Sequence, residues 1–258
     1  MPDAAVDAAT RWLPYGPDAI SSDRLRVFCF PFAGGGGSFY LPWRKDLPAV
    51  EICPVQPPGR EGRSDEAMPT SFEALADDAA RAIAPFAGAR HVFFGHSMGA
   101  LLAFDVARRL GPDRRPSLLI LSGKAAPSLP ADPPLSGLSD DALLSIAATR
   151  WNDPAAKALD RDLADFFLPT LRADLRLLES RPLESRTPPP PAPPLDCPLL
   201  VLGGTSDAAV PIEKLVPWRR QTSGAFRLRL FAGGHFYLRE DRVRMLAALR
   251  EELPSGHT

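Results

Sequence analysis

The sequence has few of the residues that build disulfide frameworks and metal sites. Its 258 residues include three cysteines and four histidines. Cys29, Cys53 and Cys197 are odd in number, far apart and set in apolar or strand-like surroundings, which excludes a disulfide framework and the close spacing of metal ligands. We therefore expect three buried thiols and no metal or redox cofactor.

An excess of basic charge and long apolar runs are absent as well. Lysine and arginine number 30 against 31 aspartates and glutamates, so the clustered positive charge of a nucleic-acid-binding protein is missing. No apolar run approaches the roughly 18 residues that a membrane-spanning helix needs. The N-terminal residues lack the basic start and apolar core of a secretory signal. We expect a cytoplasmic monomer that binds neither nucleic acid nor membrane.

The remaining composition is that of an ordinary globular protein. Hydrophobic residues make up 45% of the chain and charged residues 24%, which is enough to fill the core of one large α/β domain. We expect an irregular leader over residues 1–23, attached to the body through Trp12, Leu13 and Tyr15, followed by a single domain over residues 24–258.

A nucleophile is predicted near the middle of the chain. Residues 91–110 have the sequence HVFFGHSMGALLAFDVARRL, in which strand-like residues precede a helical pattern. Between them Gly95-His96-Ser97-Met98-Gly99 forms G-x-S-x-G at a strand-to-helix turn. Such a turn strains the serine backbone and leaves no room for a Cβ at the two glycines. Ser97 is therefore the candidate nucleophile, and the Met98 N–H at the helix start can stabilise a negative oxygen.

A glycine-rich loop, PFAGGGGS at residues 31–38, follows the first predicted strand. It can bring backbone N–H groups close to a ligand. A phosphate-binding loop requires G-x-x-x-x-G-K-[ST], or G-x-G-x-x-G at a helix start, and the lysine is missing here. The other functional interpretation is the second half of an oxyanion hole, with the N–H of Ala33 as donor. Ser97 favours the oxyanion hole, and a flexible turn stays a third interpretation.

Strand-like and helix-like segments alternate through most of the chain. This order predicts an α/β fold with a mostly parallel central sheet and helices on both faces. Strands are expected at residues 25–30, 50–55, 92–94, 117–122, 198–203 and 226–231, and helices at residues 71–87, 101–110 and 240–253.

The alternation stops after residue 124. Helices are expected at residues 138–149 and 160–179, with no strand between them, and such a stretch is too long for an ordinary crossover. We predict a helical lid inserted at about residues 131–187, which shapes the pocket and excludes water. The proline-rich tract at residues 187–194 is interpreted as a stiff connector back to the sheet in preference to a polyproline ligand.

The serine needs a base and an acid that orients it. In α/β-hydrolases these residues follow in the order serine, acid, histidine, and this chain offers Ser97, Asp207 and His235. Asp207 and His235 each come just after a predicted strand, and the carboxyl ends of parallel strands meet at one edge. Of the other histidines, His91 starts a strand, His96 lies inside the turn and His257 lies in the C-terminal tail. The sequence therefore predicts a Ser97–His235–Asp207 triad.

With these residues assembled, the chain resembles the type II thioesterases, the free-standing α/β-hydrolases that accompany polyketide and nonribosomal peptide synthases. The resemblance runs from about residue 25 to residue 253. It rests on FCFPFAGGGG (28–37), PPGREGR (57–63), GHSMGALLAFDVARRL (95–110), GGTSDAAVP (203–211) and GGHFYL (233–238). The resemblance implies the same triad, an oxyanion hole at Ala33 and Met98, and a flexible lid near residues 135–181.

The resemblance also implies a substrate: an acyl chain on the phosphopantetheine arm of an acyl carrier or peptidyl carrier protein domain of a synthase. Two rival functions are compatible with the same fold. One is a carboxylester hydrolase or lipase with the same triad, and the other is a non-catalytic carrier-protein-binding partner. Acyl transfer to an alcohol or amine is a third possibility, which depends on whether the lid excludes water.

Overall fold

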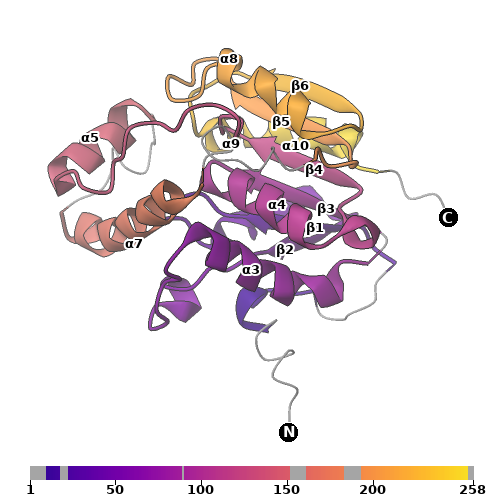
Figure 1. Ribbon diagram of the computed structural model, residues 1–258, viewed down its shortest axis with the longest axis horizontal. Helices are drawn as coiled ribbons and strands as arrows, with labels where there is room; N and C mark the ends of the chain where they lie inside the picture. The colour runs from indigo at the N-terminus through magenta and orange to yellow at the C-terminus, as the bar shows by residue number, and fades with distance from the viewer. Residues whose placement is uncertain (1–9, 18–22, 89, 152–160, 183–192, 255–258) are drawn as a thin grey trace, which may run out of the picture.

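The computed structural model describes residues 10–17, 23–88, 90–151, 161–182 and 193–254. Within them six strands form one sheet, in which all neighbours run parallel in the order β2-β1-β3-β4-β5-β6 (Figure 1). The strands are β1 (Arg26–Phe30), β2 (Glu51–Pro54), β3 (His91–His96), β4 (Leu118–Ser122), β5 (Leu199–Gly204) and β6 (Phe226–Phe231).

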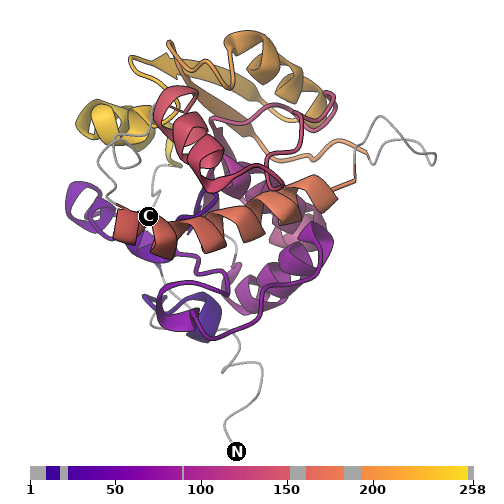
Figure 2. The same ribbon diagram turned by 90° about the vertical axis from the view of Figure 1, so that its left-hand side faces the viewer.

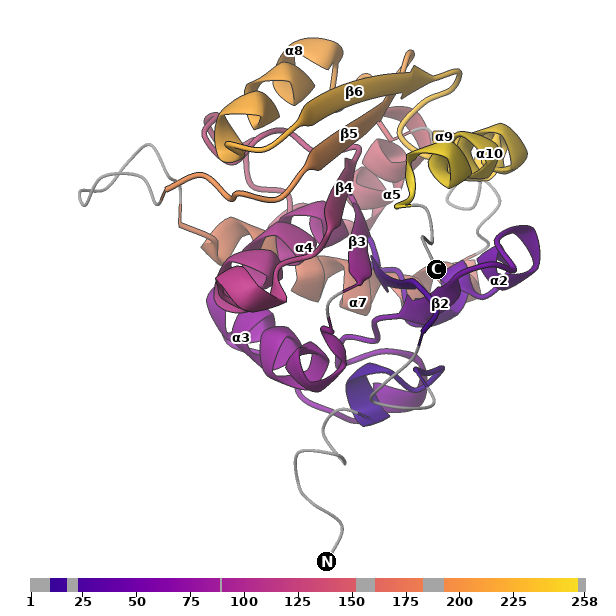
Figure 3. The ribbon, with the colours of Figure 1, turned by 90° about the vertical axis from the view of Figure 1, so that its right-hand side faces the viewer.

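Helices cover both faces of this sheet (Figure 3). One face carries α3 (Phe72–Ile83) and α4 (Met98–Arg109), and the other carries α2 (Trp43–Asp46), α9 (Tyr237–Glu240) and α10 (Arg242–Glu252). A short helix, α8 (Ile212–Leu215), follows β5. The 3-10 helices are η1 (Gly37–Tyr40), η2 (Glu61–Arg63), η3 (Ala84–Phe86), η4 (Pro112–Arg114) and η5 (Val216–Gln221).

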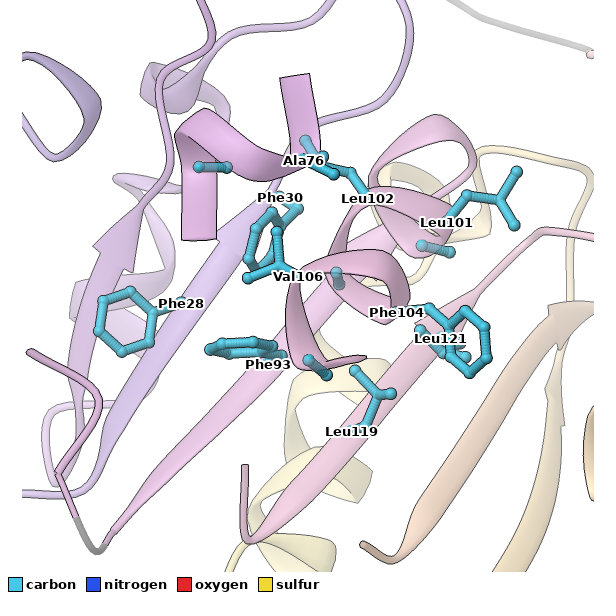
Figure 4. Close-up of a cluster of buried hydrophobic side chains, with 14 of the residues drawn as sticks. Phe28, Phe30, Ala76, Phe93, Leu101, Leu102, Phe104, Val106, Leu119 and Leu121 are labelled. Atoms are coloured by element: carbon cyan, nitrogen blue, oxygen red, sulfur yellow. The ribbon is translucent and has the colours of Figure 1, made fainter. Parts of the chain in front are cut away.

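The core lies on both sides of the central strands because their residues are all buried and mostly apolar. Successive residues of a strand point to opposite faces. Phe93 of β3 accordingly belongs to the same buried cluster as Leu102 and Val106 of α4 (Figure 4). Its neighbour Phe94 belongs to the cluster on the other face, where its ring lies 4.9 Å from that of Trp43.

The order of strands reverses beside β1. The chain goes from β1 to β2 on one side, then returns to place β3 on the other side. The loops after β1 and β3 therefore diverge at one edge and leave a crevice, which is the usual ligand site of an open parallel sheet. The glycine-rich loop and the G-x-S-x-G turn are these two loops.

Two helices lie beyond the carboxyl edge of the sheet. α5 (Asp140–Thr149) begins at Ser139, whose side chain accepts a hydrogen bond from the N–H of Ala142, and α7 (Arg161–Ser180) crosses in front of this edge (Figure 2). Leu143 of α5 and Leu171 of α7 are buried in a small cluster of their own. This pair of helices is held partly by its own apolar contacts.

The α/β-hydrolase class predicted from the sequence is confirmed. Each predicted strand lies within a few residues of its expected place, whereas the short helices α2 and α8 were not predicted. Trp12 and Leu13 of the predicted leader are buried in the core. The proline-rich tract lies mostly outside the described residues. Among those residues no helix is long and apolar enough to cross a membrane.

Candidate active site

The turn between β3 and α4 holds Ser97 in a strained backbone conformation. Its φ of 53° and ψ of −116° lie outside the usual regions for a residue with a side chain. A Cβ on Gly95 would lie 2.1 Å from the carbonyl oxygen of Gly99, and a Cβ on Gly99 would lie 2.1 Å from that of Phe30. Both glycines are therefore required by the close approach of backbone segments, as the sequence predicted.

A methyl group on Gly99 tests this packing. We expect Gly99→Ala to lower the free energy of unfolding by about 1–3 kcal/mol, because β1 and the turn must separate to admit it. Gly62→Ala is the matched control, since nothing lies within 4 Å of its Cβ position. Chemical denaturation of both variants measures the difference. Equal stability of the two variants would contradict a sterically closed turn.

Asp207 and His235, the acid and base that the sequence predicts, lie side by side in the structure. The Nδ1 atom of His235 lies 2.7 Å from Oδ2 of Asp207, and both residues are buried. Oδ1 of Asp207 accepts hydrogen bonds from the N–H groups of Ala209 and Val210, at 2.9 and 3.0 Å. Burial opposes the charge of this carboxyl, but His235 and the two N–H groups outweigh burial and hold the pKa of Asp207 below its usual range.

Ser97 and His235 line the same cavity, which has a volume of about 400 Å³. Gly123 also lines it, and its Cβ position lies 3.4 Å from Cε1 of His235. Among the described residues there is no hydrogen bond between the Ser97 hydroxyl and His235. Because Asp207 engages Nδ1 of His235, Nε2 is the ring nitrogen that can take a proton from the serine.

The backbone N–H groups of the glycine-rich loop are largely engaged by the protein itself. Gly34 donates to Asp174 at 2.7 Å, Gly37 donates to Gln56 at 2.8 Å, and Ser38 faces the carboxylate of Glu61. These contacts exclude a phosphate cradle. The N–H of Ala33 has no acceptor among the described residues, and the N–H of Met98 is the first of α4, where no intrahelical partner exists.

A buried ion pair links this loop to α7. The guanidinium of Arg60 donates to both carboxylate oxygens of Asp174, each at 2.6 Å, and also to the carbonyl of Gly35 at 3.0 Å. Asp174 is fully buried and accepts the Gly34 N–H as well. The ring of Phe167, also on α7, fills the space where a Cβ on Gly34 would lie, 2.5 Å away. The position of α7 thus fixes the loop beside Ala33.

This linkage was not predicted from the sequence. In the sequence, PPGREGR (57–63) contributes only to the family resemblance. No local pattern pairs Arg60 with a carboxylate 114 residues away. The sequence offers no local signal for this role, because Arg60 stands beside Glu61 and Arg63 in a charged segment.

A second serine and histidine pair lies below the site. Nδ1 of His96 is 2.8 Å from the Ser122 hydroxyl, which is 2.6 Å from the hydroxyl of Tyr237. His96 and Ser122 have no exposed surface and do not line the cavity. Burial, then the nearby His235 and Arg239, lowers the pKa of His96 well below its usual range. This network supports the His235 ring, 5.0 Å from that of His96, and has no access to substrate.

The three cysteines are buried free thiols, as predicted. Burial raises the pKa of Cys29 and brings that of Cys197 to about 11, so neither is a nucleophile at neutral pH. In the part of the chain that the structure describes, no cluster of three or more histidine, cysteine or acidic residues is placed to hold a metal ion.

Sequence comparison adds an independent finding. A family profile described as a thioesterase domain matches residues 25–253. The gramicidin S biosynthesis protein GrsT of Aneurinibacillus migulanus is 32% identical over 252 residues, which cover 96% of this chain and 96% of GrsT. The thioesterase PikA5 of Streptomyces venezuelae is 37% identical over 223 residues, which cover 84% of this chain and 76% of PikA5.

Solved structures share the same fold over nearly the whole chain. RedJ, a thioesterase from the prodiginine pathway of Streptomyces coelicolor, is 37% identical with a TM-score of 0.79, covering 95% of this chain and 99% of RedJ. BorB, a type II thioesterase from the borrelidin biosynthetic cluster, is 33% identical with a TM-score of 0.80, covering 95% of this chain and 96% of BorB.

Proposed function

Because this chain belongs to the thioesterase domain family, as a type II thioesterase of nonribosomal peptide and polyketide pathways, we propose that Ser97, His235 and Asp207 carry its hydrolytic reaction. The substrates are acyl chains on the phosphopantetheine arm of acyl carrier or peptidyl carrier protein domains. Removal of stalled or aberrant chains is the editing role. The observation that carries the proposal is the buried Asp207–His235 hydrogen bond beside a cavity that Ser97 also lines.

The reaction proceeds through an acyl-enzyme. Nε2 of His235 takes the proton of the Ser97 hydroxyl as Oγ attacks the thioester carbonyl, while Asp207 stabilises the imidazolium. The tetrahedral oxyanion accepts hydrogen bonds from the N–H groups of Ala33 and Met98. Collapse breaks the C–S bond, and the carrier thiol leaves with the proton from His235. A water molecule, deprotonated by His235, then cleaves the Ser97 ester by the same route.

The cavity suits an acyl chain. Its wall is largely apolar, with Leu101, Trp151 and Leu178 among the lining residues, and it extends from Ser97 to the inner face of α7. We assign residues 131–187 the role of a lid over a single domain, because α5 and α7 stand at the carboxyl edge and part of α7 closes the cavity. A lid in this place excludes water from the thioester until the acyl chain is seated. Water then reaches the acyl-enzyme only while an acyl chain is bound.

The partner and location follow from the substrate. A carrier domain brings its acyl chain on a flexible arm, so the enzyme needs only transient docking and acts as a monomer. We expect a cytoplasmic location, where a carrier-bound substrate is met, and no nucleic acid or membrane partner.

The choice between a thioesterase and an oxygen-ester hydrolase rests on the substrate. We expect kcat/KM for an acyl carrier thioester to exceed that for a p-nitrophenyl ester of the same acyl group, because the carrier and its arm add binding energy outside the acyl pocket. Steady-state kinetics with both substrates measures the ratio. A strong preference for the oxygen ester would overturn the carrier-bound substrate. Adding a primary alcohol or amine to the assay separates hydrolysis from acyl transfer, since transfer would yield an ester or amide.

A further inference from the structure

A lysine stands in the otherwise largely apolar wall beside the candidate nucleophile. Lys124 comes two residues after the end of β4 and lines the cavity together with Ser97. Its carbonyl accepts a hydrogen bond from Nε1 of Trp218 at 2.7 Å, which fixes its backbone. The preceding residue, Gly123, has a φ of 59° and its Cβ position lies 3.4 Å from the His235 ring. The backbone of Lys124 therefore adjoins the reacting centre.

The ammonium of Lys124 has no hydrogen bond to a protein group among the described residues. Asp132 is the nearby carboxylate, but it already accepts from Nζ of Lys214 at 2.8 Å and lies 3.5 Å from Nη2 of Arg150. Arg181, on the same wall, is held by Asp105 at 2.8 Å. Positive charge thus exceeds negative charge around Lys124, and burial lowers its pKa.

Such a cation inside a pocket needs an acceptor. A plain alkyl chain bound against Lys124 would remove water from the ammonium and supply nothing in its place. A chain that carries an oxygen near the thioester would supply the missing hydrogen bond. A site built around one polar contact rejects a substrate that lacks the matching group much more strongly than it rejects a change of length.

We propose that Lys124 is a specificity-determining residue that donates a hydrogen bond to an acceptor oxygen of the acyl chain, so that oxygenated chains are favoured substrates. The acceptor is a carbonyl, hydroxyl or carboxylate oxygen close to the thioester. This inference rests on the proposed thioesterase function and names the substrate class of the same site.

Chains of equal length test the proposal. Wild-type protein and Lys124→Met are compared on butanoyl and 3-oxobutanoyl carrier thioesters, and the ratio of kcat/KM values is taken for each protein. Intrinsic reactivity of the two thioesters cancels when the two ratios are compared. We expect the preference for the 3-oxo chain to fall at least about 10-fold in Lys124→Met, since a charge-assisted hydrogen bond is lost.

Two further variants act as controls. Lys45→Met removes an exposed cation of α2 that does not line the cavity and should keep the wild-type ratio. Lys124→Arg retains a donor and should keep most of the preference. An unchanged ratio in Lys124→Met would overturn the proposal, even if its overall rate falls.

Three other results would overturn the proposal or the function on which it rests. If Lys124→Met slows all phosphopantetheine substrates equally but not the same chains on pantetheine without its phosphate, the ammonium binds the phosphate and the proposal fails. If wild-type protein hydrolyses both chains with no preference, the proposal fails while the thioesterase function stands. If it hydrolyses neither thioester, the proposed function itself fails.

Discussion

Replacing Ser97 with alanine is expected to reduce kcat for carrier-thioester hydrolysis by about 10⁵–10⁶-fold, the scale seen when a catalytic serine is removed from a triad. The remaining rate would come from the oxyanion hole and substrate binding alone. Single-turnover hydrolysis of an acyl carrier thioester measures the loss. The fold should persist, because Ser97 contributes a backbone N–H bond to the carbonyl of Ser122, at 2.8 Å, which alanine retains.

Ser122→Ala is the matched control for that prediction. It removes the serine hydroxyl that is hydrogen-bonded to His96 and lies wholly buried beneath the site. We expect this variant to be less stable by about 1–3 kcal/mol, since His96 and Tyr237 lose a buried partner. It should still form the acyl-enzyme. If Ser122→Ala were inactive in a stable fold while Ser97→Ala stayed active, the nucleophile assignment would be wrong.

Replacing Asp174 with alanine is expected to lower the free energy of unfolding by about 3–5 kcal/mol. Removing one partner of a buried ion pair leaves the other charge uncompensated, and Arg60 is almost fully buried. The N–H of Gly34 loses its acceptor in the same variant. Because the loop beside Ala33 then loses its contact with α7, kcat should fall more than KM changes. Denaturant unfolding and steady-state kinetics at a temperature where the variant is folded measure both effects.

Two comparisons separate this ion pair from a surface pair. Asp140→Ala breaks the contact of Arg172 with α5, where the carboxylate is mostly exposed, and should cost less than about 1 kcal/mol. The double variant Arg60→Met with Asp174→Leu removes both charges and should recover much of the stability, though not the anchoring of Gly34. If the free energy of unfolding of Asp174→Ala lay within about 1 kcal/mol of the wild-type value, the pair would behave as a surface pair and its burial would be contradicted.

The placement of the candidate site residues was predictable from the sequence because each residue is marked by local structure. Gly95 and Gly99 report a turn that admits no Cβ, and this turn holds Ser97. Asp207 and His235 follow apolar strands, and parallel strands bring their carboxyl ends together whatever their separation in the chain. The sheet was predictable for the same reason, since buried parallel strands are nearly continuous apolar runs.

The contacts between α7 and the loops at the edge of the sheet could not be predicted in this way. Arg60 and Asp174 lie in segments with no shared periodicity, and their pairing depends on how α7 crosses the edge of the sheet. No local pattern in the sequence marks Lys124 as a residue of the pocket. Its place in the cavity wall depends on the path of residues 125–135, which has no repeating pattern. The short helices α2 and α8 contain too few residues for a helical period to be recognised.

The most direct test of the account is the site of acylation. Wild-type protein is mixed with an acyl carrier thioester, quenched within the first turnover, and its peptides are analysed by mass spectrometry. We predict the mass of one acyl group on the peptide that contains Ser97, and its disappearance in Ser97→Ala. Hydrolysis without any acylated intermediate at Ser97, or an acyl group attached to another residue during turnover, would contradict the account.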